Sequence, residues 1–112
     1  MTTQIFGTNK CRVTQKAVRF FKERGADYQF IDINTKAPSP GELDDMISRA
    51  GADTLLDTES KTYKKRGMAY MEFDPAEEIA EHPELLKTPA VRNRQSLCVG
   101  ADEECWAQAL AP

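Results

Sequence analysis

The chain opens with a short β-prone segment, and apolar residues then follow at a helical spacing. Residues 3–6 are followed by Gly7 and predict a first strand. Beyond a polar turn, apolar residues recur at i, i+4, i+7 and i+8, as in an amphipathic helix; they are Val13, Ala17, Phe20 and Phe21. Arg24 and Gly25 predict its end. Residues 28–33 alternate apolar and polar side chains, so we expect a second strand, parallel to the first after a right-handed crossover.

The middle of the chain is predicted to be helical. The Ser-Pro-Gly-Glu run at 39–42 is a capping box with proline in the first turn, and the residues that then line one face are Leu43, Met46, Ile47 and Ala50. The Asp-Pro-Ala-Glu run at 74–77 starts another helix, which ends before Pro83 because a residue that precedes proline avoids the α region. Between them we expect a turn and a short basic helix over residues 55–67.

The end of the chain returns to β-structure. Residues 89–92 and 96–100 flank a polar turn and predict a hairpin. A last helix from about Asp102 places four residues on one stripe: Cys105, Trp106, Ala109 and Leu110. The predicted order is therefore strand–helix–strand, a helical insert, and strand–strand–helix.

Composition narrows the class of protein. A chain of 112 residues and 12.6 kDa hides roughly two-thirds of its unfolded surface, which suits one core and excludes two full domains. Fifteen basic and 18 acidic residues give a net charge of -3, which argues against nucleic-acid binding. The chain contains no long apolar run and begins without a visible signal peptide, so we expect no membrane contact.

The cysteines lie at positions 11, 98 and 105, an odd number without a CxxC pair. This pattern predicts a cytoplasmic protein without a disulfide framework. We expect Cys105 to lie in the core. We expect Cys98 to lie inside or at the edge of the sheet and to have no role in resolving a mixed disulfide. With one histidine, His82, placed at a helix end, we expect no metal site. Any chemistry should then use one thiol at a time.

Cys11 is the candidate nucleophile because it follows a strand and a turn and opens a helix. The free N–H groups and partial positive charge at a helix start favour a thiolate over a thiol. Lys10 and Arg12 flank the cysteine and add positive charge, and Thr14 lies one turn away, where its hydroxyl could donate to the sulfur. The alternative is a structural cysteine that happens to begin a helix.

The Thr88-Pro89 step enters a predicted strand and could be cis. Only about 5–6% of such bonds are cis in folded proteins, so base rate alone favours trans. This step, the order of elements and several motifs together resemble the ArsC/Spx/YffB family of arsenate-reductase-like proteins. The motifs are residues 5–11 with Thr14, residues 55–58 leading to 60–63, residues 82–89 and residues 97–100.

The resemblance implies an α/β fold of the thioredoxin-like (glutaredoxin-like) type in a single domain, 1–112. Its core would comprise residues 1–36 and 86–112, with a helical insert at 37–85. It also implies that Pro89 is cis and that Cys11 is the nucleophile. No bound cofactor is implied.

Arsenate reductases of this family place arginines around the oxyanion, and this chain has other residues at the matching positions. They are Asp57, Thr88 and Val99. Fixed guanidinium groups suit an oxyanion and an aspartate repels it, so this difference argues against arsenate reduction. Three arginines lie nearby and could replace the missing ones: Arg12, Arg92 and Arg94. Arg92 and Arg94 are at or beside the hairpin turn, where they could simply be solvated.

A threonine before the proline is instead typical of glutaredoxin-like proteins, in which the backbone at this point pairs with an extended thiol such as glutathione. We therefore expect Cys11 to form a mixed disulfide that glutathione, or a reductant of the glutaredoxin or thioredoxin type, resolves. The expected catalytic residues are Cys11, Arg12 and Thr14, and those expected to bind substrate are Lys10, Thr88, Pro89 and Arg92.

Two alternatives stay open. The family contains Spx, a regulator that binds RNA polymerase, so the chain could be an adaptor for a protein partner. Its docking surface could be the local basic face, which is otherwise solvated: Lys61, Lys64, Lys65 and Arg66. The other alternative is a glutaredoxin-coupled arsenate reductase.

Overall fold

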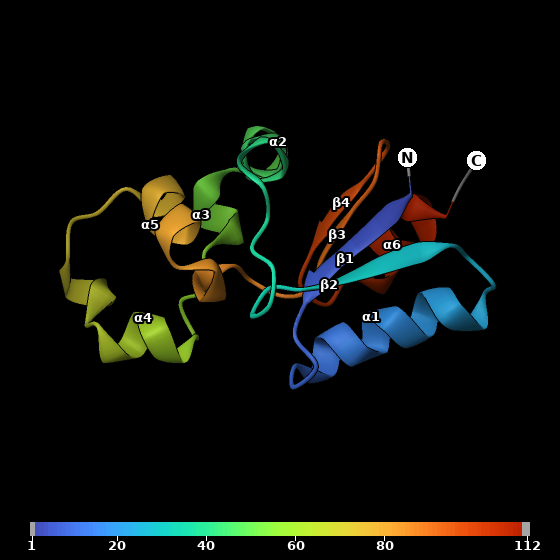
Figure 1. The fold of residues 1–112 in the computed structure, drawn as a ribbon, viewed down its shortest axis with the longest axis horizontal. Helices are drawn as coiled ribbons and strands as arrows, with labels where there is room; N and C mark the ends of the chain where they lie inside the picture. The colour runs from blue at the N-terminus through green and yellow to red at the C-terminus, as the bar shows by residue number, and fades with distance from the viewer. Residues whose placement is uncertain (1, 111–112) are drawn as a thin grey trace.

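A four-stranded mixed sheet organises the chain, and the computed structural model describes residues 2–110 (Figure 1). The strand order is β2-β1-β3-β4. The central strand β1 (Thr3–Gly7) pairs parallel with β2 (Tyr28–Asp32) and antiparallel with β3 (Ala90–Arg92). The hairpin partner of β3 is β4 (Leu97–Val99), so β2 and β4 are the two edges.

Helices cover both faces of this sheet. Helices α1 (Arg12–Glu23) and α6 (Glu103–Ala109) lie on one face, and α2 (Pro40–Ala50) lies on the other (Figure 1). The remaining insert extends past the end of the sheet and makes the molecule elongated, 43 × 26 × 24 Å. It contains α3 (Ala52–Leu55), α4 (Lys61–Lys65), η1 (Met68–Tyr70), α5 (Pro75–Glu81) and η2 (Pro83–Leu85).

This arrangement confirms the expected thioredoxin-like fold, and the predicted caps explain where its helices begin. The Ser39 side chain accepts from the Glu42 backbone N–H while the Glu42 carboxylate accepts from the Ser39 N–H, which completes the capping box. The Asp74 side chain accepts from the Ala76 backbone N–H at the start of α5, and that helix ends at His82, before Pro83. The short helix α3 was not predicted, because it begins at Gly51 without a side-chain cap.

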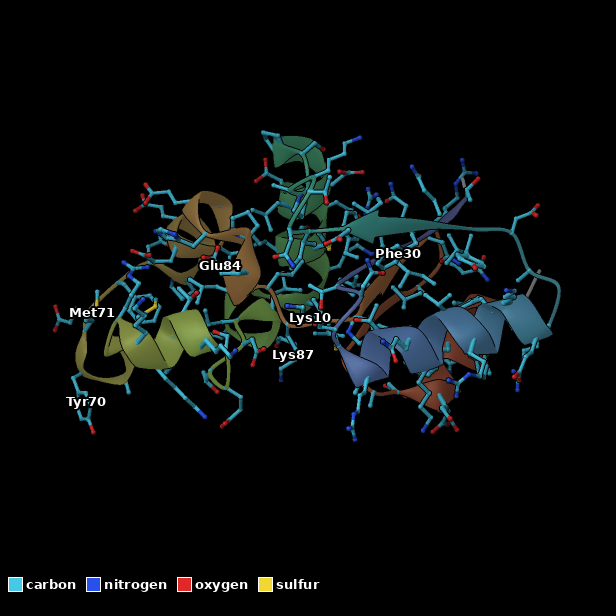
Figure 2. All side chains as sticks on the ribbon, turned by 60° about the horizontal axis from the view of Figure 1, so that its bottom comes forward. Lys10, Phe30, Tyr70, Met71, Glu84 and Lys87 are labelled. Atoms are coloured by element: carbon cyan, nitrogen blue, oxygen red, sulfur yellow. A yellow bond between two sulfur atoms is a disulfide. The ribbon has the colours of Figure 1, made fainter. Side chains whose placement is uncertain are left out.

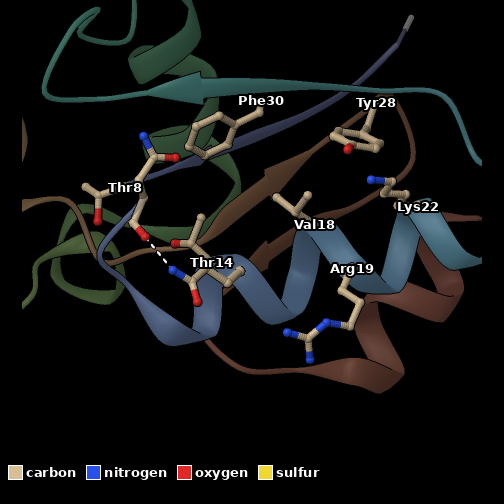
Figure 3. Close-up of a pocket in the computed structure, with 9 residues that line it drawn as sticks. Thr8, Thr14, Val18, Arg19, Lys22, Tyr28 and Phe30 are labelled. Atoms are coloured by element: carbon tan, nitrogen blue, oxygen red, sulfur yellow. Dashed lines mark hydrogen bonds between the residues drawn. The ribbon is translucent and has the colours of Figure 1, made fainter.

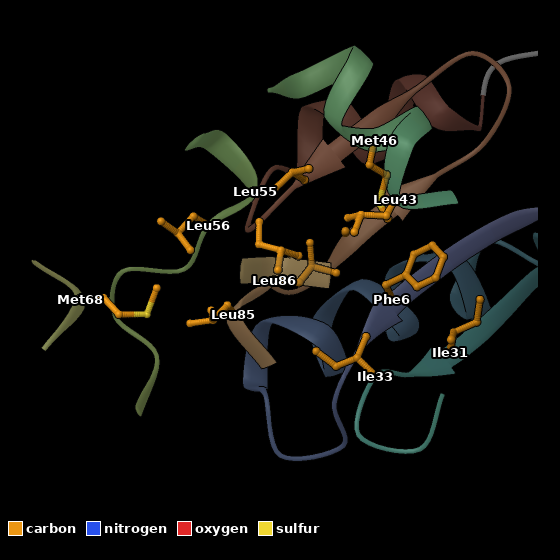
Figure 4. Close-up of a cluster of buried hydrophobic side chains, with 12 residues drawn as sticks. Phe6, Ile31, Ile33, Leu43, Met46, Leu55, Leu56, Met68, Leu85 and Leu86 are labelled. Atoms are coloured by element: carbon orange, nitrogen blue, oxygen red, sulfur yellow. The ribbon is translucent and has the colours of Figure 1, made fainter. Parts of the chain in front are cut away.

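The β pleat divides the core into two clusters, since successive side chains point to opposite faces. Phe6 of β1 and Ala90 of β3 face α2 and the insert, where they meet a layer of leucines and methionines (Figure 4). Ile5 and Val91 face the other way, toward α1 and α6, and pack with the fully buried Trp106. Both clusters use β1, so the insert and the C-terminal helix are held by the same central strand.

Gly7 ends β1 at a point where no larger residue fits. A Cβ atom at Gly7 would lie 2.4 Å from both Cγ2 and Oγ1 of Thr14, a distance that real Cβ contacts do not show. The missing side chain lets the first turn of α1 pack directly on the end of β1.

None of the described helices is long and apolar enough to cross a membrane.

We predict that Gly7→Ala lowers the free energy of unfolding by about 1–3 kcal/mol, because the added methyl overpacks a rigid contact. Chemical denaturation of the purified chain measures this change. Gly41→Ala is the matched control, since a Cβ at Gly41 meets nothing within 4 Å, and this variant should be neutral or slightly more stable. Equal stability of the two variants would contradict the close approach.

Candidate functional site

Cys11 occupies the N-cap of α1, as its position in the sequence predicted. Its backbone is extended, and its sulfur accepts a hydrogen bond from the Thr14 backbone N–H at 3.4 Å. The Cys11 side chain is partly exposed, and this is the free cysteine among the described residues. The sulfur therefore lies at a helix start, where amide groups are available to an anion, and a reactant can reach it.

The sheet brings a segment from the far end of the sequence to this sulfur. Phe6 pairs with Ala90, so the start of β3 lies beside the end of β1 and the loop that leads to Cys11. The Thr88-Pro89 peptide bond is cis, as the family resemblance implied. The Thr88 hydroxyl donates to Cys11 Sγ at 3.4 Å, and the Cys11 thiol lies 3.9 Å from the Thr88 carbonyl oxygen.

Opposing effects act on the protonation of Cys11. Burial of the sulfur raises its pKa, while hydrogen bonds from the Thr14 and Thr88 side chains and from the backbone N–H groups of Thr14 and Val13 lower it. The hydrogen bonds outweigh burial, so the pKa of Cys11 lies below its ordinary value. The Thr14 hydroxyl oxygen is buried and makes no hydrogen bond of ordinary geometry within residues 2–110.

The three cations predicted to act at this site differ in their positions relative to the Cys11 sulfur. Lys10 and Arg12 flank Cys11 but are exposed, so solvent screens their charges, and hydrogen bonds are the main causes that lower the pKa. Arg92 lies at the opposite end of β3 from Pro89. Its guanidinium donates to Asp45 of α2 at 2.8 Å and to Gln4, so it ties the insert to the sheet.

A groove along α1 was not predicted. It has a volume of about 440 Å³ and lies between α1 and the edge strand β2, with Thr8 and Thr14 at one end and Lys22 and Tyr28 at the other (Figure 3). Phe30 and Tyr28 supply an apolar wall, while Arg19 and Lys22 of α1 lie farther along the helix. Strand β2 and helix α1 were both predicted, but the space between them depends on how they pack.

The expectation that no disulfide forms is wrong. Cys98 of β4 and Cys105 of α6 are joined by a disulfide, with their Cα atoms 5.8 Å apart, within the roughly 4.4–6.8 Å that such a bond spans. Cys105 is therefore not a simple core residue. The six intervening positions carried no signal of this contact, because they cover a strand end, a turn and a helix start whose relative placement is set by packing.

Other polar groups are already engaged. Glu78, Glu81 and His82 have ligand atoms within 4.8 Å of one another, but the Glu78 carboxylate accepts from Arg66 at 2.7 Å, which also lowers the pKa of Glu78.

At the far end of the insert, Tyr70 and Met71 point into solvent, well away from Lys10 at the centre of the molecule (Figure 2).

Comparison with known proteins relates this chain to others by sequence and, separately, by fold. The model of the ArsC family matches residues 6–109. A relative in Oceanobacillus iheyensis, the global transcriptional regulator Spx 2, is 31% identical over 115 residues, which cover 98% of this chain and 84% of that protein.

Among solved structures, the YFFB protein has a TM-score of 0.85 at 23% identity, over 98% of this chain and 100% of that one. The arsenate reductase from Vibrio cholerae has a TM-score of 0.82 at 21% identity, over 98% of both chains. At these identities the two structures establish a shared fold.

We predict that Thr88→Val slows alkylation of Cys11 by iodoacetamide at pH 7 by about 3- to 10-fold, because the thiolate loses a hydrogen-bond donor and its pKa rises. Thr88→Ser keeps the hydroxyl and should react at close to the wild-type rate. Mass spectrometry of the alkylated chain measures both rates. A Thr88→Val chain that reacts as fast as wild type would show that this hydroxyl does not stabilise the thiolate.

Proposed function

Because the chain belongs to the ArsC family, whose model covers residues 6–109, we propose that it is a cytoplasmic thiol-dependent oxidoreductase with Cys11 as its nucleophile. The observation that carries this proposal is the setting of one sulfur. Cys11 is partly exposed at the start of α1, beside the residue that precedes cis-Pro89, and its pKa is lowered. A lowered pKa increases the fraction of thiolate at neutral pH, and the thiolate is the nucleophile.

The proposed reaction is thiol–disulfide exchange in two steps. The Cys11 thiolate attacks one sulfur of a substrate disulfide, forms a mixed disulfide, and releases the other sulfur as a thiolate that takes up a proton. An external thiol such as glutathione, or a reductant of the glutaredoxin or thioredoxin class, then attacks the substrate-derived sulfur and regenerates the Cys11 thiolate. One half of the substrate disulfide thus leaves as a thiol, and the other half leaves in a mixed disulfide with the external thiol. A second external thiol reduces this mixed disulfide, so that the substrate gains two electrons and the two external thiols become a disulfide.

The backbone at Thr88 supports an extended thiol as the substrate. The Thr88 N–H makes no hydrogen bond within residues 2–110, and its carbonyl oxygen faces the sulfur. A peptide-like thiol that lies along this segment could use both groups by strand addition, as in other edge-pairing modes of recognition. Glutathione, a short peptide with a central cysteine, fits this description.

Arsenate reduction receives less support from this site. The charge that an oxyanion needs is not supplied by Thr88, and Arg92 is engaged with Asp45 and Gln4. The solved arsenate reductase from Vibrio cholerae shares the fold at 21% identity, which does not transfer its activity. In a glutaredoxin-coupled assay we therefore expect no turnover of arsenate by this chain.

A regulatory adaptor is the second candidate function. The relative from Oceanobacillus iheyensis that covers 98% of this chain is a global transcriptional regulator. The insert also presents Tyr70, 95% exposed, and Met71, 40% exposed, on a part of the surface remote from Lys10, which precedes Cys11 in the chain (Figure 2). An adaptor that docks RNA polymerase through this end would not need the thiol.

We predict that oxidised glutathione places one glutathione on Cys11 and on no other cysteine, and that Cys11→Ser abolishes this adduct. Intact-mass measurement with peptide mapping detects it. Thr14→Ser is the control, because it keeps the backbone N–H and hydroxyl that face the sulfur. An unmodified Cys11 after prolonged exposure would contradict the proposed exchange.

The adaptor alternative gives a separate prediction. If it is correct, Cys11→Ser should bind purified RNA polymerase as wild type does, whereas replacing Tyr70 and Met71 together by serine should weaken binding at least several-fold. Surface plasmon resonance compares the variants. Absence of binding by the wild-type chain would remove this alternative and leave the oxidoreductase proposal intact.

A further inference from the structure

The two cysteines of the Cys98–Cys105 disulfide differ in their exposure to solvent. Cys98 is 1% exposed and lies in the core cluster with Val91 and Trp106, whereas Cys105 on α6 is partly exposed. Thiol–disulfide exchange requires direct approach of a thiolate to one sulfur of the pair. An external thiol can therefore react at Cys105, and Cys98 would be the leaving group.

The charges around this pair are opposite to those beside Cys11. The three residues that directly precede Cys105 are acidic and exposed: Asp102, Glu103 and Glu104. The Asp102 carboxylate accepts from the Cys105 backbone N–H at 3.0 Å. Lys16 of α1 pairs with Glu103 of this cluster at 3.2 Å. Cys11, in contrast, lies between Lys10 and Arg12.

We propose that Cys98–Cys105 is a second thiol–disulfide exchange site, independent of Cys11, which accepts neutral or cationic thiols and disfavours anionic ones. Its physiological reductant would be a dithiol protein with positive charge beside its reactive cysteine, by charge complementarity with α6. The two sulfur sites would thus divide their reactants by charge. This inference goes beyond the proposed function, because Cys11 takes no part in it.

The reaction at this site is a two-electron reduction. A thiolate of the dithiol reductant attacks Cys105 Sγ, the Cys98–Cys105 bond breaks, and Cys98 leaves as a thiolate that takes up a proton. The second thiolate of the reductant then attacks its own partner sulfur in the mixed disulfide, and Cys105 leaves and is protonated. The pair gains two electrons and two protons, and the reductant becomes a disulfide.

The single tryptophan of the chain reports on this bond. Trp106 follows Cys105 on α6, is fully buried, and packs in the same cluster as Cys98 and edge-on to Phe20, with ring centroids 5.5 Å apart. Disulfides quench the emission of a neighbouring indole. Reduction should therefore increase Trp106 fluorescence without any added probe.

The test uses the full chain with Cys11→Ser, so that no other thiol reacts. Denaturing alkylation before reduction should label no cysteine, and after dithiothreitol it should label two. The rate of reduction is then followed by Trp106 fluorescence with 2-aminoethanethiol, 2-mercaptoethanol and 3-mercaptopropionate, each corrected for its thiolate fraction. At low salt we expect the cationic thiol to react about 3- to 10-fold faster than the anionic one, and this difference should shrink in 1 M salt.

A matched pair of variants isolates the acidic cluster. Glu103→Gln with Glu104→Gln keeps the Asp102 cap and should largely remove the charge preference. Glu77→Gln with Glu81→Gln changes the net charge equally on α5 and should keep it. Two labelled cysteines before reduction, reduction only when the chain is unfolded, or an unchanged charge preference in the Glu103 and Glu104 variant would each overturn the proposal.

Discussion

The hydrogen bonds that reach the Cys11 sulfur are the interaction on which the account of this protein depends. One comes from the first turn of α1, through the Thr14 N–H, and another from the Thr88 hydroxyl, which is distant in sequence. Both favour the charged form of the sulfur and oppose the effect of its burial. Without them, Cys11 would be an ordinary, mostly protonated thiol at the start of α1, and the first step of the proposed exchange would lack most of its nucleophile at neutral pH.

The fold makes this convergence possible by placing the two segments at one end of the sheet. Strand β1 pairs parallel with β2 on one side and antiparallel with β3 on the other. The antiparallel pairing places Thr88, which precedes β3, at the end of β1. Gly7 then lets Thr14 approach the strand closely. The insert is anchored from the other face, where Asp45 of α2 pairs with Arg92. Arg92 thereby serves the fold at a position where the sequence suggested contact with substrate.

Local signals predicted much of this arrangement, and long-range contacts account for what was missed. The N-cap position of Cys11 and the capping box at Ser39 follow from a few neighbouring residues, so the sequence was sufficient for them. The disulfide between Cys98 and Cys105 and the engagement of Arg92 by Asp45 depend on how separate elements pack, which residue spacing does not reveal. The cis bond at Pro89 was reached through the family resemblance, since base rates favour trans.

The ultraviolet absorbance of the thiolate as a function of pH measures whether the Cys11 sulfur is held as an anion. With Cys98 and Cys105 joined, Cys11 is the free thiol of the described chain, so one titration reports one group. We expect a midpoint below that of an unperturbed cysteine, and no such transition in Cys11→Ser. A midpoint at or above that value would contradict the claim that hydrogen bonds at the start of α1 hold this sulfur as an anion.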